Sequence, residues 1–222
     1  MYEPLTNFWQ QLQHEGNYIY KQLQQLKSRY PDPSSAKGLF LDAKESINDL
    51  KIDAKDRAVA FYIVNKCSFS GLTESSSFSK QASDSNFSMR GIERIPGFSQ
   101  LIERWKITGL SYEDMLSDEK SVFTYLDPPY DIKDNLYGKK GDMHKSFDHD
   151  QFAHDCDNHT GHQLISYNSS QLVKDRFSGW NVSQFNHTYT MRSVGQYMKN
   201  QQKRQELVIY NYGCLLYTSP SP

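Results

Sequence analysis

Four consecutive residues in the second half of the chain have the types and order needed to hold an exocyclic amino group. Asp127-Pro128-Pro129-Tyr130 follows the β-rich run from Ser121 to Leu126, which reads as a buried strand. The prolines remove backbone donors and leave the local carbonyls facing outward as acceptors. Asp127 and the Pro128 carbonyl can therefore accept both hydrogens of one amino group, which aims the nitrogen lone pair at an electrophilic methyl group. Tyr130 offers a ring face on which a planar base can stack, worth about 1–3 kcal/mol per base.

The elements around this motif are expected to alternate between strands and helices. Strands are predicted at residues 106–110, 121–126, 163–167 and 206–210, and helices at 112–116, 147–156 and 171–177. Such alternation predicts an α/β sheet that presents ligands at the carboxyl ends of its strands. The plainer alternative for the motif is a proline-rich turn after a strand, in which Asp127 only caps a neighbouring group.

The first half of the chain reads as mainly helical. Leu5, Phe8, Trp9 and Leu12 share one helical face, and the pattern continues to Leu26. A loop is predicted at 30–35, a second helix at 54–64 and a long ordered loop at 67–90. Residues 92–105 are predicted to be partly helical, with an interruption at Pro96-Gly97.

Composition and cysteine use restrict the class of protein. A chain of 222 residues that is 37% hydrophobic has room for one compact domain, or for one core with a smaller inserted lobe. No apolar run reaches the roughly 20 residues that a membrane span needs, and no secretory signal is visible. Three widely spaced cysteines favour a reduced, cytoplasmic compartment over a disulfide framework, and no zinc site is expected from them.

Histidines and charge give weaker indications. His144, His149, His154 and His159 recur every five residues, a spacing that drifts around a helix, so no metal site is predicted. His144 is expected in a loop near the motif, and the other three on the surface. The net charge of −1 does not indicate a nucleic-acid binder, although basic residues gather at 133–145 and 199–204.

Several segments carry a resemblance to a known family. They are Asn65–Leu72, Ser111–Met115, Asp127–Tyr130, Leu136–His144, Phe147–Asp150, Ile165–Asn168 and Arg204–Tyr212. Together they make the chain similar, from Met1 to Tyr212, to the Dam-like, D12-class adenine-N6 DNA methyltransferases of bacteria and their phages. The resemblance implies an α/β fold, an incomplete Rossmann-like class I methyltransferase sheet with an inserted, mainly helical DNA-recognition lobe.

The resemblance also implies a cofactor, a partner and site residues. The methyl donor would be S-adenosylmethionine, and the partner would be double-stranded DNA with the target adenine flipped into a pocket. A monomer without membrane association is expected. The implied catalytic residues are Asp127, Pro128, Pro129 and Tyr130, and the implied cofactor-binding residues are Glu113, Asp114 and Asp127. The implied base-binding residues are Tyr130, Tyr137, Lys139, His144, Tyr167 and Asn168, and the implied DNA-binding residues are Lys66, Lys80, Arg90 and Arg94.

Structural roles remain open for several of these residues. Glu113 or Asp114 can instead cap the short helix in which they lie, and Tyr167 can be a core aromatic residue. Each of the four cations can be a plain surface charge.

The domain organisation follows from the same resemblance. Residues 1–30 would be a helix of a truncated cofactor domain, 31–105 the target-recognition lobe, and 106–213 the catalytic part of the methyltransferase domain. Residues 214–222 are expected to be a non-native tail. The glycine-rich cofactor motif of the family is missing, because no glycine follows an early strand. We therefore expect the chain to be a fragment of an active enzyme.

Two other functions remain open. A DPPY loop can hold any exocyclic amine, so methylation of RNA or of cytosine N4 is one alternative, although cytosine enzymes more often carry Ser in place of Asp127. The second is a DNA-binding module without catalysis, which would bind DNA equally well after Asp127→Ala.

Overall fold

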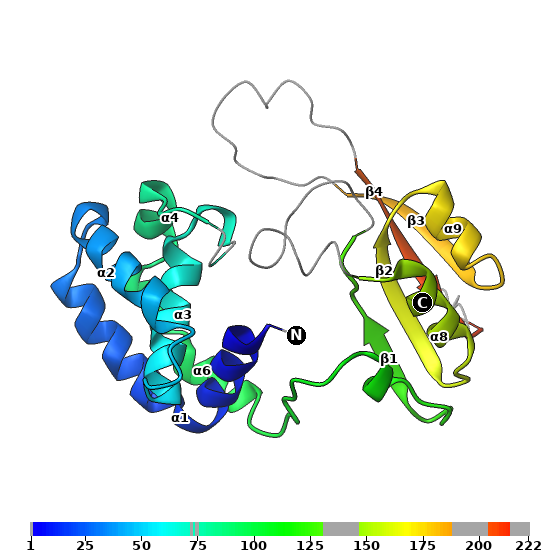
Figure 1. Ribbon diagram of the computed structural model, residues 1–222, viewed down its shortest axis with the longest axis horizontal. Coiled ribbons are helices and arrows are strands. Elements are labelled where there is room, and N and C mark those ends of the chain that lie inside the picture. Colours follow the sequence, from blue (N-terminus) through cyan, green and yellow to red (C-terminus); the bar gives the residue numbers. More distant parts are fainter. Residues whose placement is uncertain (1, 72, 74–75, 131–146, 188–203, 214–222) are drawn as a thin grey trace, which may run out of the picture. The chain divides into compact units, whose positions relative to one another are not determined.

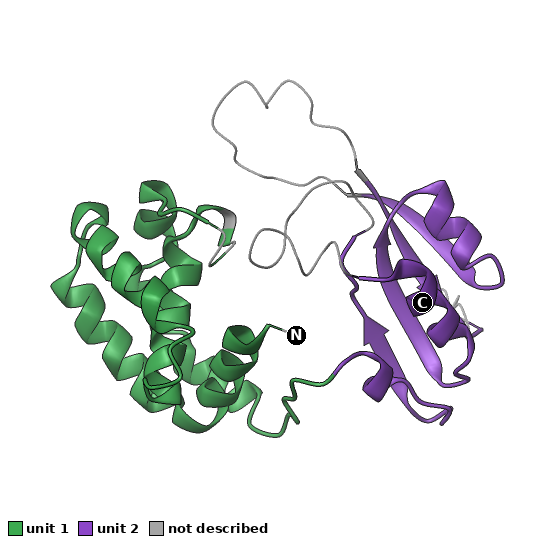
Figure 2. Ribbon diagram, in the orientation of Figure 1, with its two compact units in different colours: residues 1–110, 135–145 green, residues 111–134, 146–222 purple. Residues whose placement is uncertain are grey.

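The computed structural model describes residues 2–71, 73, 76–130, 147–187 and 204–213. The described residues form two compact units, one of residues up to Leu110 and one of residues from Ser111 onward (Figure 2). The first, unit 1, is helical, and the second, unit 2, contains a sheet (Figure 1).

Most of the helices of unit 1 begin at a residue whose side chain caps them. The helices are α1 (Glu3–Arg29), α2 (Pro33–Ser46), α3 (Ala54–Cys67), α4 (Lys80–Ser85), α5 (Met89–Ile92) and α6 (Ile95–Leu101), with a 3₁₀ turn, η1, at Phe69–Gly71. Asp32 accepts from the backbone N–H groups of Ser34 and Ser35 at 2.8 and 3.0 Å, and caps α2. Asp53 does the same for α3 through Lys55 N–H at 3.0 Å.

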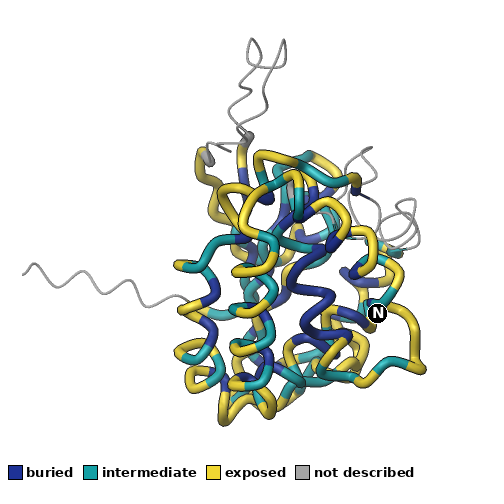
Figure 3. Tube along the Cα trace, turned by 90° about the vertical axis from the view of Figure 1, so that its left-hand side faces the viewer, coloured by how far each residue is buried: buried dark blue, intermediate teal, exposed yellow. Residues whose placement is uncertain are grey.

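Helix α3 is the centre of unit 1. Its residues from Arg57 to Val64 are all buried, because α1 and α2 pack around it (Figures 1 and 3). Helix α1 contributes a buried stripe that includes Leu12, Ile19 and Leu23. Gly16 lies in this stripe, and a Cβ atom there would collide with the Ser99 side chain, so glycine lets α1 and α6 approach closely.

Unit 2 is built on a four-stranded mixed sheet. The strands are β1 (Phe123–Leu126), β2 (His162–Asn168), β3 (Asn181–His187) and β4 (Arg204–Tyr210), in the order β1-β2-β4-β3. β1 and β2 are parallel, and β4 is antiparallel to both of its neighbours. The carboxyl ends of β1 and β2 and the amino end of β4 therefore lie at one edge of the sheet.

One face of this sheet carries the core of unit 2. Alternate residues of β2 are buried, including Ile165 and Tyr167, and they pack with residues of α8 (His149–Asp157) and α9 (Gln171–Arg176) (Figure 1). The opposite face carries Phe123 and Tyr125, which are 57% and 58% exposed. A short 3₁₀ turn, η3 (Glu113–Met115), precedes the sheet.

The mixed α/β character and most of the expected elements are confirmed. The strand expected at 106–110 is wrong: these residues form no regular element, and Ile107 packs on the core of unit 1 instead. The sequence interpretation missed α2 and β3, and treated as loop the segment that contains α4 and the start of α5. The interruption placed at Pro96-Gly97 is also wrong, because both residues lie within α6, with Pro96 in its first turn. Within the described ranges, no helix is both long and apolar enough to cross a membrane.

Candidate active site

The DPPY motif lies at the edge of the sheet where several polar side chains converge. Leu126, the last residue of β1, pairs with Ile165 of β2. Asp127 therefore begins the loop beside the last residues of β2. Farther along β2, Asn168 pairs with Glu206, which lies near the start of β4. Parallel strand ends in α/β sheets are where ligands bind.

A serine of the neighbouring strand holds the Asp127 carboxylate. Ser166 Oγ donates to Asp127 Oδ1 at 2.7 Å, and Tyr125 Oη lies 2.9 Å from the same serine oxygen. Asp127 is exposed, and its Oδ2 has no hydrogen-bond partner in the described part of the chain. One carboxylate oxygen is thus fixed by the protein while the other can accept a hydrogen from a ligand.

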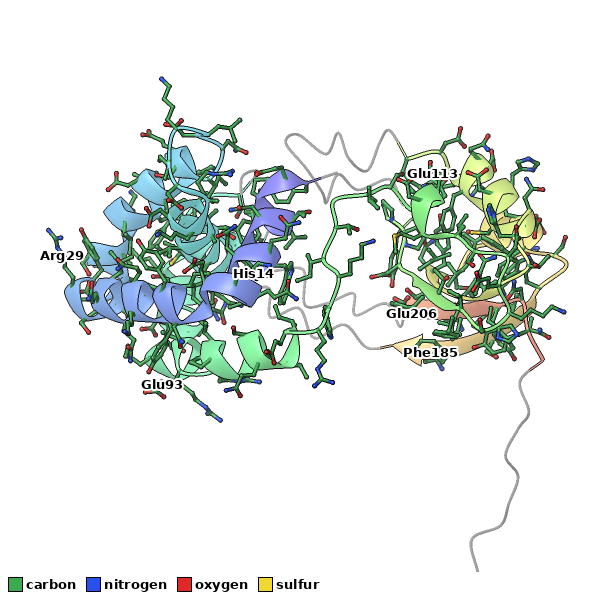
Figure 4. All side chains as sticks on the ribbon, turned by 90° about the horizontal axis from the view of Figure 1, so that it is seen from below. His14, Arg29, Glu93, Glu113, Phe185 and Glu206 are labelled. Carbon is green, nitrogen blue, oxygen red and sulfur yellow. The ribbon has the colours of Figure 1, made fainter. Side chains whose placement is uncertain are left out.

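Tyr130 is held by a buried carboxylate and by a second tyrosine. Its hydroxyl donates to Glu206 Oε2 at 2.6 Å, a short charge-assisted bond, and Glu206 is only 6% exposed. Its ring stacks on Tyr167, with centroids 6.5 Å apart and planes 25° apart. Figure 4 places Glu206 on β4, beside the strand that carries Phe185. The loop after β1 is therefore anchored to β2 and to β4.

Tyr167 connects this cluster to the core. It is fully buried, and its ring lies 6.5 Å from Phe152 and 6.4 Å from Phe177. Its hydroxyl makes a short hydrogen bond with His149 Nδ1. Tyr167 is thus a core aromatic residue, which was one of its two possible roles. Its ring also stacks on the ring of Tyr130.

The N-terminus of α8 brings His149 to the site. Asp148 caps the helix by accepting from the backbone N–H groups of Asp150 and Gln151 at 3.1 and 2.9 Å. His149 is half-buried against Tyr167, so the expectation that it lies on the surface is wrong. His159 is also half-buried, with Nδ1 2.8 Å from the Asp155 carbonyl. In the part of the chain that the structure describes, no group of three or more His, Cys, Asp or Glu residues could hold a metal.

Two of the three carboxylates expected at the cofactor, Glu113 and Asp114, make local hydrogen bonds. Asp114 accepts from the Ser111 backbone N–H at 3.2 Å, and Glu113 accepts from the Ser111 hydroxyl. Tyr112, between them and Ser111, donates to Asp155 at 2.8 Å and ties the turn to α8. Burial and that hydrogen bond raise the pKa of Tyr112.

These contacts tie both carboxylates to Ser111, which precedes the turn, and the turn has no side-chain cap, so the capping role that the sequence left open is not the one they have. Both carboxylates remain exposed. An exposed carboxylate can accept a hydrogen from the amino group of an adenine ring. The sequence has no glycine-rich turn for the rest of the donor.

The expected DNA-binding cations lie in unit 1. Lys66, Arg90 and Arg94 border one cavity between α1, α3 and the segment from Ser85 to Phe98. Lys80 is exposed in the first turn of α4 and is not among the residues that border the cavity. Tyr137, Lys139 and His144, expected at the base, lie outside the described residues.

The sequence interpretation did not select four residues of the site. Ser166, Glu206 and His149 each contact a residue that it did select. Tyr125 contacts Ser166. Glu206 carried a usable signal, because it is the one charged residue of the strand predicted at 206–210. Ser166 and Tyr125 become partners only through the register of β1 and β2.

Comparison with known proteins agrees with the motif. The model of the D12 class N6 adenine-specific DNA methyltransferases matches residues 1–194, most of the 222-residue chain. No curated protein matches the chain. The match includes β1, the DPPY loop and all of β2. The chain belongs to the D12 class N6 adenine-specific DNA methyltransferase family.

Proposed function

We propose that this chain binds and orients the target base in a methyl-transfer reaction. The reaction moves a methyl group from S-adenosylmethionine to N6 of a flipped adenine in duplex DNA. The observation that carries this proposal is the Asp127 carboxylate, which Ser166 fixes through one oxygen while Oδ2 stays available at the strand end. Family membership supplies adenine N6 as the acceptor and DNA as the substrate.

The chain's own residues would orient the amino group. Asp127 Oδ2 accepts one N6 hydrogen and the Pro128 carbonyl accepts the other, which turns the nitrogen lone pair out of the base plane. The adenine ring stacks on Tyr130, whose orientation is fixed by Glu206 and by the Tyr167 ring. Holding two reacting groups in line can supply an effective molarity of about 10⁵ M or more.

A proton must leave N6 when the new carbon–nitrogen bond forms. Asp127 is the acceptor that the geometry supports, because its carboxylate is exposed and can pass the proton to water. The donor, when bound, supplies an electrophilic methyl group on a sulfonium centre. Glu113 or Asp114 would accept from the amino group of the donor's adenine.

The remaining assignments stay proposals. Residues 31–105 would be the target-recognition lobe, with phosphate contacts from Lys66, Lys80, Arg90 and Arg94. Residues 1–30 would belong to the cofactor domain, although α1 packs with α3 and α6 in unit 1. A cytoplasmic location and a monomeric state are predictions from the sequence.

Mass spectrometry of nucleosides from DNA incubated with the protein and donor tests the proposal. The assay is run on these 222 residues and on the product of the whole gene, after calorimetry has established donor binding for each. We expect N6-methyladenine, and its loss in Asp127→Ala. DNA binding without methylation by a donor-bound protein would favour the non-catalytic module, and N4-methylcytosine or methylated RNA would favour the other alternative.

A further inference from the structure

Unit 1 contains a cavity of about 560 Å³ to which no function has been assigned above. Phe8, Phe61 and Tyr62 are buried residues that line it. The centroid of the Phe8 ring lies 5.3 Å from that of Phe61 and 6.3 Å from that of Tyr62. Trp9 and Phe98 also line it but are 37% and 41% exposed. The cavity therefore combines a buried aromatic lining with aromatic rings that remain open to solvent, which suits a planar ligand.

The charged residues that border this cavity are all positive. They are Lys66, Arg90 and Arg94, and the described lining includes no Asp or Glu. Among the residues with determined positions, no carboxylate forms an ion pair with any of the three. Lys66 Nζ lies 5.6 Å from the Tyr62 ring centre and Arg94 Cζ lies 5.3 Å from that of Phe98. These charges are held against aromatic faces without being neutralised, so the cavity favours an anionic ligand.

One polar group of the lining has no hydrogen-bond partner among the described residues. Tyr62 is 7% exposed, and its hydroxyl makes no hydrogen bond with the described part of the protein. Burial raises the pKa of Tyr62 to about 12, so the hydroxyl keeps its proton and can donate. Tyr62 lines the cavity, so a ligand with a polar edge can accept a hydrogen from this hydroxyl.

We propose that this cavity binds an unpaired nucleotide of a DNA strand. The base packs on the aromatic lining, the Tyr62 hydroxyl bonds to the base edge, and Lys66, Arg90 and Arg94 contact the adjoining phosphates. This inference rests on the proposed function only for the choice of DNA as the polymer. A free nucleotide has the same chemistry, so the experiment compares the two sources.

Fluorescence anisotropy with four competitors tests the ligand. They are a short single-stranded oligonucleotide, an abasic strand of equal length, a hairpin duplex without unpaired bases, and a deoxynucleoside monophosphate. We expect the intact strand to bind roughly tenfold or more tightly than the abasic strand, because only it can stack. With three phosphate contacts, the affinity should fall with salt with a logarithmic slope of about −2.

Matched variants test the site. Trp9→Leu should weaken strand binding about tenfold, whereas Trp105→Leu, which alters an exposed tryptophan outside the cavity, should not. Arg94→Gln should reduce the salt slope, and Arg104→Gln, at an exposed position outside the cavity, should leave it unchanged. Tyr62→Phe keeps the ring and should lower affinity for the intact strand without lowering that for the abasic strand.

Several results would overturn the proposal. Equal binding of intact and abasic strands, or of strand and duplex, would make the cavity wall a plain phosphate-binding surface. Monophosphate binding as tight as strand binding would assign the cavity to a free nucleotide. Insensitivity to both Trp9→Leu and Tyr62→Phe in folded protein would remove the cavity from DNA binding. All measurements use Asp127→Ala protein without donor, so a failure of methyl transfer cannot be mistaken for a failure of this site.

Discussion

Asp127 depends for its orientation on a residue of another strand. The Ser166 hydroxyl holds one oxygen of the Asp127 carboxylate and also contacts the Tyr125 hydroxyl. The position of the carboxylate therefore depends on the pairing of β1 with β2. In the proposed reaction Ser166 would be a positioning residue, because it would act on the amino group only through Asp127.

Ser166→Ala should slow methyl transfer while Asp127 remains in place. A misplacement of about 1 Å in such a site can cost about 100-fold in rate, so we expect a reduction between tenfold and that value. The loss should lie mainly in kcat, measured with labelled donor, and Ser166→Thr, which keeps a hydroxyl, should recover most of it. An unchanged kcat in Ser166→Ala would show that the carboxylate orients itself.

Tyr130→Phe should destabilise the protein, because buried Glu206 loses a short hydrogen bond. A hydrogen bond to a charged group contributes about 1.5–3 kcal/mol, and we expect the free energy of unfolding in urea to fall by that order. Glu206→Gln keeps an acceptor for the tyrosine and should cost less. Additive effects in the double variant would show that the two side chains do not interact.

At the scale of elements, α8 connects the core of unit 2 to the site. Asp148 caps this helix and sets the position of His149, which contacts Tyr167. Phe152 and Cys156 on the same helix are buried in the core.

Asp148→Ala should destabilise α8 by about 1 kcal/mol, since it removes the acceptor for two backbone N–H groups. The rate at which a thiol reagent labels buried Cys156 reports opening of this helix, and it should rise in the variant. Lys120→Ala serves as the control, because Lys120 is exposed and makes no hydrogen bond or ion pair with the described residues. Equal labelling rates in both variants would contradict a role for the cap.

Elements with strong periodicity could be predicted from the sequence. The apolar face of α1 and the β-rich runs of β1, β2 and β4 are visible without a structure. Helix α2 was missed because its start signal, Asp32 followed by Pro33, was interpreted as part of a loop, although Asp at the cap and Pro at the first position also begin helices. Strand β3 is polar and exposed, so its sequence shows little alternation.

The error at residues 106–110 has a different cause. Lys-Ile-Thr-Gly-Leu is a plausible strand by composition, but a strand needs a partner, and Ile107 packs on helices instead. Of the site, the sequence indicates the DPPY loop and Tyr167. It cannot indicate Ser166, because that contact depends on strand register.

At the scale of the whole molecule, the two units have separate hydrophobic cores, and each contains one buried cysteine. Burial raises the pKa of the Cys67 thiol, and it raises the pKa of the Cys156 thiol to about 12. Both thiols therefore stay protonated in the folded state at a pH where they ionise in the unfolded chain.

The stability of the protein should therefore fall as the pH rises above about 9, the ordinary value for a cysteine thiol. Below that pH the thiols are protonated in both the folded and the unfolded state, so they do not change the free energy of unfolding. Above it, each such thiol costs up to about 1.4 kcal/mol per pH unit, until the folded pKa is reached. Urea midpoints at pH 8, 9 and 10 measure the slope, which should be shallower in Cys156→Ala; an identical slope would contradict this origin.

The placement of β4 between β2 and β3 has a consequence for how the protein is made (Figure 1). On the ribosome, β3 is synthesised before β4, yet β4 is its only neighbour among the described strands. Strand β3 therefore has no partner among the described strands until residues 204–210 have been synthesised. Glu206, the partner of Tyr130, arrives with β4. The DPPY motif is therefore synthesised well before Glu206, the residue that accepts the hydrogen bond from the Tyr130 hydroxyl.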